Sequence, residues 1–197
     1  IDIGSVRGFT LEFACNGNTP ICNGNIVRID ANAAPPATQS FTNLNNTHIP
    51  AGGTTTGVST PYPNTLAVAG LPATGVSVKS VTLTNFSHSF PDDVDIVLVS
   101  PTGQSVILMS DAGGSADATG QTFTLDDAAA SFLADAAFNA TGSYKPTNYG
   151  AGDSWPVVGS PTATTLSTFT GNMNGNWSLY AFDDLTGDIG FLSTWTI

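Results

Sequence analysis

The residues of this chain best suited to chemistry are aspartates that border one apolar hairpin. The segment 92–111 reads DDVDIVLVSPTGQSVILMSD. Pro-Thr-Gly-Gln between two apolar runs predicts a tight turn, because proline presets φ and glycine accepts a positive φ. A hairpin centred on Thr102-Gly103 pairs residues whose numbers sum to 205. Asp95 then faces Ser110, and Asp111 follows one position further along.

This register gathers Asp93, Asp95 and Asp111 at the open end of the hairpin, since alternate residues of a strand share a face. Carboxylates at cross-strand distance repel one another unless a positive charge lies between them. No Lys or Arg occurs in residues 92–120. We therefore expect a bound calcium ion, which takes about six to eight oxygen ligands, loop carbonyls included. A solvated acidic rim is the alternative.

A second acidic turn, DDLTGD, occupies residues 183–188. We add Asp183, Asp184 and Asp188 to the predicted calcium ligands, although an ordinary polar hairpin loop would explain them equally well. Fourteen of the fifteen acidic residues are Asp, the usual carboxylate of loop-borne calcium sites. Neither acidic segment matches the EF-hand pattern.

Cys15 and Cys22 are the only cysteines. They predict a disulfide that closes a small loop and stabilises it by about 2–3 kcal/mol; two unrelated free thiols are the alternative. Disulfides form in oxidising compartments, so we expect a secreted or cell-surface protein. No apolar stretch is long enough to span a membrane. The formal net charge of −11, with only four basic residues, argues against nucleic-acid binding.

Short apolar runs with period two, separated by Gly, Pro, Asn and Asp, predict an all-β fold. We expect a jelly-roll β-sandwich of about eight strands over residues 41–197. Residues 1–40 are expected to form an N-terminal strand or hairpin extension that carries the disulfide loop. An Ala-rich stretch, residues 126–138, favours a loop with a helical turn over a full helix. The predicted strands are Thr65–Ala69, Val76–Leu83, Val94–Ser100, Ser105–Met109, Gln121–Leu125, Thr164–Phe169, Trp177–Phe182 and Thr194–Ile197.

Two segments resemble a known domain. Residues 88–103, HSFPDDVDIVLVSPTG, resemble the stretch HxxxGDLxIxLxSPxGT of the P domain (Homo B domain) of subtilisin-like proprotein convertases. GNWSLYAFD (175–183) and GFLSTWTI (190–197) resemble the closing motif of that domain, so the resemblance covers about residues 41–197. It implies an eight-stranded jelly roll that accompanies and stabilises a protease. Similar domains occur without a protease in bacterial secreted and surface proteins. Asp93 matches the motif aspartate, whereas Asp92 and Gln104 replace its Gly and Thr.

No catalytic machinery is predicted. His48 and His88 are the only histidines and no GxSxG elbow accompanies them; a structural hydrogen bond is expected of His88. We predict a non-catalytic calcium-binding structural module that mediates assembly or surface attachment. Its N-terminal arm would pair with the sheet edge of another copy or a protein partner, unless it packs on itself. The alternatives are an accessory domain of a secreted hydrolase and a carbohydrate-binding module. In the last case Tyr144, Tyr149 and Trp155 would form the platform, unless they anchor their loop.

Overall fold

A computed structural model of the chain describes residues 38–53, 56–150, 155–156 and 160–197. Within it, Ser40–Ile197 form one compact unit. The predicted arm and its Cys15–Cys22 disulfide lie outside the described residues apart from positions 38–40. The arm, the disulfide and the domain boundary at residue 40 therefore stay predictions.

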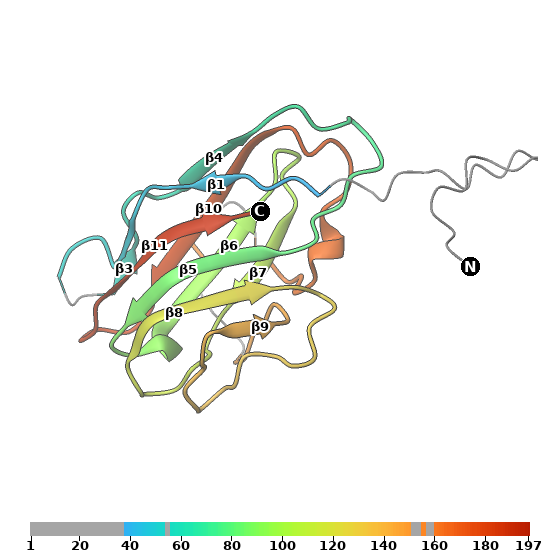
Figure 1. Cartoon of the computed structure of the whole chain (residues 1–197). Helices are drawn as coiled ribbons and strands as arrows, with labels where there is room; N and C mark the ends of the chain where they lie inside the picture. Colours follow the sequence, from blue (N-terminus) through green and yellow to red (C-terminus); the bar gives the residue numbers. More distant parts are fainter. Residues whose placement is uncertain (1–37, 54–55, 151–154, 157–159) are drawn as a thin grey trace, which may run out of the picture. The chain divides into compact units, whose positions relative to one another are not determined.

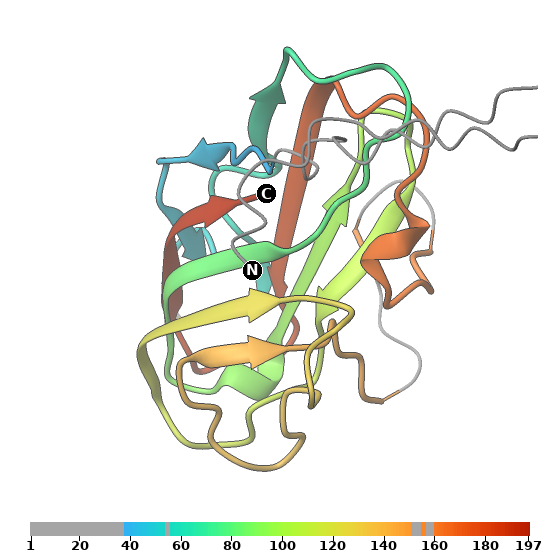
Figure 2. The same ribbon diagram turned by 45° about the vertical axis from the view of Figure 1, so that its right-hand side comes forward.

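The described residues form two β-sheets packed face to face (Figures 1 and 2), so the predicted all-β sandwich is confirmed. We call them sheet A, in strand order β1-β11-β5-β8-β9 with β2 also on β11, and sheet B, in order β3-β10-β6-β7 with β4 also on β10. All pairs are antiparallel except β8–β9. Sheet A comprises β1 (Thr42–Asn43), β2 (Thr47–Ile49), β5 (Val81–His88), β8 (Ala118–Leu125), β9 (Gly142–Tyr144) and β11 (Gly190–Thr196). Sheet B comprises β3 (Gly57–Val58), β4 (Asn64–Val68), β6 (Val94–Val99), β7 (Ser105–Met109) and β10 (Gly175–Asp183).

Large apolar side chains of both sheets fill the space between them. Trp177 of β10 and Trp195 of β11 are about 1% and 0% exposed, with Phe86 and Phe123 beside them in the same core. Each such side chain contributes about 1.5–3 kcal/mol through burial. The indole N–H of Trp177 donates to the Met173 carbonyl at 3.0 Å, which satisfies its polar edge. The two tryptophans of the closing motif are thus core residues.

The predicted β6–β7 hairpin is present, with a register that changes along its length. Near the turn Val97 pairs with Ile107, one residue off the predicted register. The Ser100 N–H donates to the Gln104 carbonyl at 2.8 Å, so the loop has three residues (101–103) between paired positions, one more than the predicted register gives. A bulge then restores the predicted partner, because Ile96 pairs with Met109. The expected register therefore holds only at the open end of the hairpin.

The predicted strand Thr164–Phe169 is wrong. The segment forms a short 3-10 helix, η2 (Leu166–Thr168). The carboxylate of Asp127 accepts the N–H groups of Leu166 and Ser167 at 2.7 and 2.9 Å. Because a carboxylate takes up both backbone donors, the segment turns where an extended chain was expected.

One predicted strand begins later than expected, and the Ala-rich stretch forms the loop that was expected. The strand predicted at Val76–Leu83 begins only at Val81, although Val76 and Val78 still pack against the core. The stretch 126–138 contains no described helix and forms the loop that the sequence favoured. Within the described ranges, no helix is long and apolar enough to cross a bilayer.

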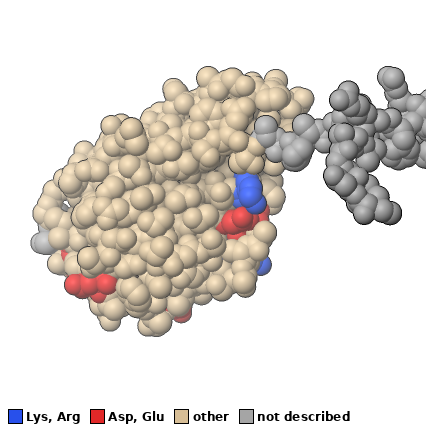
Figure 3. All heavy atoms as spheres, viewed as in Figure 1, with Lys and Arg blue, Asp and Glu red and all other residues tan. Residues whose placement is uncertain are grey.

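The outer face of sheet A carries a row of hydroxyl side chains, here called the hydroxyl face. Thr42, Thr196, Thr82, Thr124 and Ser143 are cross-strand neighbours on β1, β11, β5, β8 and β9. Hydroxyl oxygens lie 2.9 Å apart between Thr42 and Thr196 and 3.3 Å apart between Thr82 and Thr124. Figure 3 shows this face almost free of charged side chains. Its solvation therefore depends on hydroxyl groups.

The outer edges of sheet B differ in how they are covered. Beside β7, the N–H of Thr147 donates to the Leu108 carbonyl at 3.1 Å and that of Tyr149 to the Ser110 carbonyl at 3.2 Å. On the opposite edge, β4 pairs with β10 alone among the described strands, although the Asn43 side-chain amide donates to the Thr65 carbonyl at 2.7 Å. An uncharged strand edge without a neighbouring strand can accept another strand.

Candidate functional site

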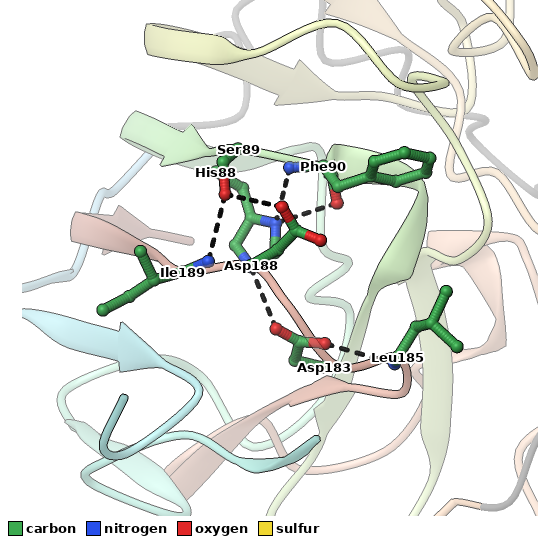
Figure 4. A network of polar contacts seen from close by, with 7 residues as sticks. All are labelled: His88, Ser89, Phe90, Asp183, Leu185, Asp188 and Ile189. Atoms are coloured by element: carbon green, nitrogen blue, oxygen red, sulfur yellow. Dashed lines mark hydrogen bonds and ion pairs between the residues drawn. The ribbon is translucent and has the colours of Figure 1, made fainter. Parts of the chain in front are cut away.

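A buried acid–imidazole contact joins the two sheets at one end of the core. His88 ends β5 of sheet A, and Asp183 ends β10 of sheet B. The side chains of both are fully buried, and His88 Nε2 lies 3.2 Å from Asp183 Oδ2 (Figure 4). Neither atom makes a hydrogen bond within the described part of the chain. The contact is attractive only when a proton lies between the two groups.

The other ring nitrogen of His88 makes two contacts with Phe90. Nδ1 lies 2.8 Å from the Phe90 carbonyl oxygen and 3.3 Å from the Phe90 backbone nitrogen. One nitrogen cannot donate and accept at once, so the shorter contact assigns the hydrogen to Nδ1. Burial lowers the pKa of His88, and burial raises the pKa of Asp183 to about 6. Both shifts favour a neutral imidazole beside a protonated carboxyl.

Asp93 lies beside this pair, at the end of the 3-10 helix η1 (Pro91–Asp93). Its carbonyl accepts the Asp184 N–H at 3.0 Å, which ties η1 to the turn after β10. Its side chain is buried and Oδ2 has no hydrogen-bond partner among the described residues. Burial, followed by the nearby Asp183, Asp184, Asp188 and Asp92, raises the pKa of Asp93 to about 7. A proton or another cation is therefore favoured at this carboxyl.

The turn between β10 and β11 is held against β5 by Ser89. The Ser89 hydroxyl donates to Asp188 Oδ1 at 2.8 Å and accepts the Ile189 N–H at 3.1 Å (Figure 4). The Ser89 N–H donates to the Ile189 carbonyl at 3.2 Å. This arrangement fixes the Asp188 carboxylate close to the buried pair. We call the group of Asp93, Asp183, Asp184 and Asp188 the acidic end.

Asp95 and Asp183 lie on opposite faces of sheet B. Asp95 pairs with Phe182, whereas Val94 pairs with Asp183, so their side chains point to opposite sides. Asp111 has a positive φ of 48°, and a Cβ on Gly150 would lie 2.8 Å from its Oδ2. The expected grouping of Asp95 and Asp111 with Asp93 stays a prediction.

The predicted acidic turn, residues 183–188, does lie near Asp93. Asp93 precedes β6 in a 3-10 turn, so strand alternation does not govern the direction of its side chain. Among the side chains that the structure describes, no three His, Cys, Asp or Glu groups are arranged to hold a metal ion. The role of the six predicted aspartates as calcium ligands therefore stays a prediction.

The basic residues that the structure describes do not neutralise the acidic end. Lys79 Nζ lies 3.7 Å from Asp126 Oδ2, and Lys145 Nζ lies 5.5 Å from the centre of the Phe132 ring. Asp183 instead contacts the His88 imidazole, whose charging is disfavoured by burial.

The tyrosines of the predicted sugar platform anchor their loop. The Tyr144 hydroxyl donates to the Ala140 carbonyl and the Tyr149 hydroxyl to the Leu133 carbonyl, both at 2.8 Å. Both rings also pack against the core. The polar edges of these rings are engaged within the chain, which favours the anchoring interpretation. Trp155 is half-buried.

The fold is a β-sandwich, and its candidate site centres on the buried contact between His88 and Asp183. The family model of the proprotein convertase P-domain matches residues 78–136, so the predicted resemblance is confirmed. The match spans β5 to β8 and includes His88 and Asp93, whereas Asp183 follows it. Such P-domains are accessory, non-catalytic domains. A comparison with curated protein sequences gives no match.

Gly190 is a site residue that the sequence analysis missed, although its GxLxxW motif was noted. It pairs with His88 across β11 and β5. A Cβ at this position would collide with the Ser87 carbonyl oxygen and the His88 ring, and would lie 2.7 Å from His88 Cα. Only glycine lets β11 lie this close to the imidazole.

We therefore expect Gly190→Ala to lower the free energy of unfolding by about 1–3 kcal/mol or more, because the added methyl overpacks a rigid site. Chemical denaturation measures the effect. Gly52→Ala is the matched control, since a Cβ there meets nothing within 4 Å. Equal stability of the two variants would contradict the close packing at Gly190.

The raised carboxyl pKa values predict a stability that depends on pH in the absence of divalent ions. A carboxyl whose pKa is raised on folding stabilises the protein below its unfolded value, about 4, and loses that contribution as the pH passes the folded value. For Asp183 and Asp93 these folded values are about 6 and about 7. The lowered pKa of His88 acts in the opposite direction below about pH 6.5. In EGTA the melting temperature should fall as the pH rises from about 5 to 7.5, because two carboxyls oppose one imidazole, and it should level off above that pH.

Asp93→Asn isolates one group, because the amide is neutral at every pH. At pH 8 in EGTA the variant should melt several degrees above the parent protein, with the gap closing towards pH 5. Asp135→Asn, at an exposed position, serves as the control and should change little. A parent protein whose stability is constant from pH 5 to 8 would contradict the assignment of a buried charge at Asp93.

Proposed function

We propose that the chain is a non-catalytic structural module of a secreted or surface protein, stabilised by calcium at its acidic end. The P-domain match supports the accessory role. The observation that carries the calcium proposal is the buried Oδ2 of Asp93, which has no hydrogen-bond partner among the described residues and faces further carboxylates. An isolated buried charge of this kind is unfavourable unless a cation or proton neutralises it.

Calcium suits this end of the sandwich for three reasons. It is a hard cation that prefers carboxylate, backbone carbonyl and water oxygens, so it does not require three converging side chains. Asp93 directly precedes β6, while Asp184 and Asp188 belong to the turn that joins β10 to β11. An ion between them would link both sheets near His88, at the point where the carboxylates otherwise repel one another.

A second candidate function, assembly by strand pairing, is supported by the open edge of β4. Thr65 and Ala67 are exposed on this strand, and no charged residue interrupts it. The N-terminal residues have the alternating pattern of a strand, and such a segment can add to an exposed sheet edge. The compact unit Ser40–Ile197 would then receive the arm of another copy.

Calcium that binds only the folded state should raise the melting temperature in a concentration-dependent way. At a calcium concentration one hundred times the dissociation constant, the gain is about 2.7 kcal/mol. Thermal unfolding at pH 8 in calcium and in excess EGTA measures it, with magnesium as the ionic control. An identical midpoint in all three solutions would exclude the calcium proposal.

Asp93→Asn should change the melting temperature in opposite directions in EGTA and in calcium. In EGTA the amide relieves repulsion and stabilises the protein, whereas in calcium it removes a ligand and abolishes most of the calcium-dependent gain. Asp135→Asn should keep the full gain. If Asp93→Asn responded to calcium as the parent does, the ion would have to bind elsewhere.

Removal of residues 1–40 tests assembly. The shortened chain should remain folded, because Ser40–Ile197 form a compact unit, and it should scatter light as a monomer. The full chain should give larger particles, and Ala67→Lys should reduce them by charging the open edge. Monomers in both preparations would refute assembly through the arm.

A further inference from the structure

A hollow at the edge of sheet A adjoins the acidic end, with which it shares His88 and Ser89, and it has further lining residues of its own. It has a volume of about 320 Å³ and lies where β2, β11, β5 and β8 are side by side. His48, Phe191 and Ser87 are cross-strand neighbours in this region. Thr119 and Asp117 line the side towards β8. Its volume falls at the lower end of the range for small-molecule sites, about 300–1,000 Å³.

The hollow exists because the residues behind it are small or turned inward. Gly190 has no side chain, and Ala118 is buried on the strand opposite His88. His88 also lines the hollow although its side chain is fully buried, and its ring is held by the Phe90 carbonyl at one nitrogen and by Asp183 at the other. This part of the lining is therefore fixed before any ligand arrives, which lowers the entropic cost of binding.

Its lining combines an apolar wall with polar groups of several kinds. The Phe191 ring is half-exposed and Ile189 is 51% exposed, so the two offer an accessible apolar surface. The Ser87 hydroxyl accepts the Gly120 N–H at 2.9 Å, which holds its oxygen in place. His48, Asp117 and Thr119 are exposed and add an imidazole, a carboxylate and a hydroxyl.

These features fit an uncharged, hydroxyl-rich ligand. The C–H face of a sugar ring packs on an aromatic side chain, while its hydroxyls both donate and accept hydrogen bonds. Asp117 accepts, and the imidazole and hydroxyls do both. The neighbouring hydroxyl face carries almost no charge (Figure 3), whereas Asp117 in the lining and Asp188 bonded to Ser89 disfavour an anionic ligand. We propose that the hollow binds a neutral saccharide unit, with Phe191 as the stacking surface.

A titration followed by two-dimensional NMR tests this proposal on the full chain. The probes are oligomers of glucose, xylose, mannose and N-acetylglucosamine at millimolar concentration, in EGTA and again in calcium. At least one should shift the amide signals at 48, 87, 117–119 and 189–191. Phe191→Ala should weaken binding about tenfold or more, whereas Phe191→Tyr should retain it because the aromatic face remains. His48→Ala, at an exposed position, should also weaken binding.

Phe132→Ala is the matched control, since it removes another exposed aromatic ring, 55% accessible, outside the hollow. It should leave the affinity unchanged. The proposal is overturned if no oligomer shifts these signals, or if Phe132→Ala weakens binding as much as Phe191→Ala. It is also overturned if only a lysine-containing peptide shifts them, because Asp117 would then be selecting a basic partner.

Discussion

The contact between His88 and Asp183 is the constraint on which the arrangement of this sandwich depends. It joins the ends of β5 and β10, which belong to different sheets. Removing one partner of a buried pair leaves the other group desolvated and uncompensated, which costs far more than an exposed ion pair contributes. β11 can approach the imidazole closely only because residue 190 is glycine. Ser89 fixes the turn between β10 and β11 through Asp188 and Ile189. The acidic end and the part of the hollow lined by His88 both follow from this one contact.

The proposed calcium ion and a proton would neutralise the same carboxyl. Burial and neighbouring carboxylates raise the pKa of Asp93 to about 7, so this carboxyl is partly protonated near neutrality. A calcium ion bound there, as proposed, would compete with the proton for the same oxygen. Its affinity would then rise with pH, as the proton leaves.

Local patterns in the sequence were sufficient for the sandwich and for parts of the site. Period-two runs predicted β6 and β7, and the Pro-Thr-Gly-Gln turn gave the correct partner for Ile96, though a bulge shifts the pairs nearer the turn. The 3-10 turn that begins at Pro91 means that strand alternation does not govern the direction of the Asp93 side chain, so its grouping with Asp95 stays a prediction. The pairing of His88 with Asp183 and the hollow beside Phe191 join strands far apart in sequence, so no local pattern contains them.

The hydroxyl face has a consequence for how the protein stays in solution. Charged surfaces keep molecules apart by a repulsion that salt screens over about 8–10 Å. Hydroxyl groups instead hold water directly, and ionic strength has little effect on that hydration. Rows such as Thr42–Thr196 and Thr82–Thr124 use β-branched residues that also favour strands, so one residue type supplies both the sheet and its solvation. The hydration of this face should therefore be the same at high and low salt concentration. The response of the molecule to pH comes instead from its few buried carboxyls.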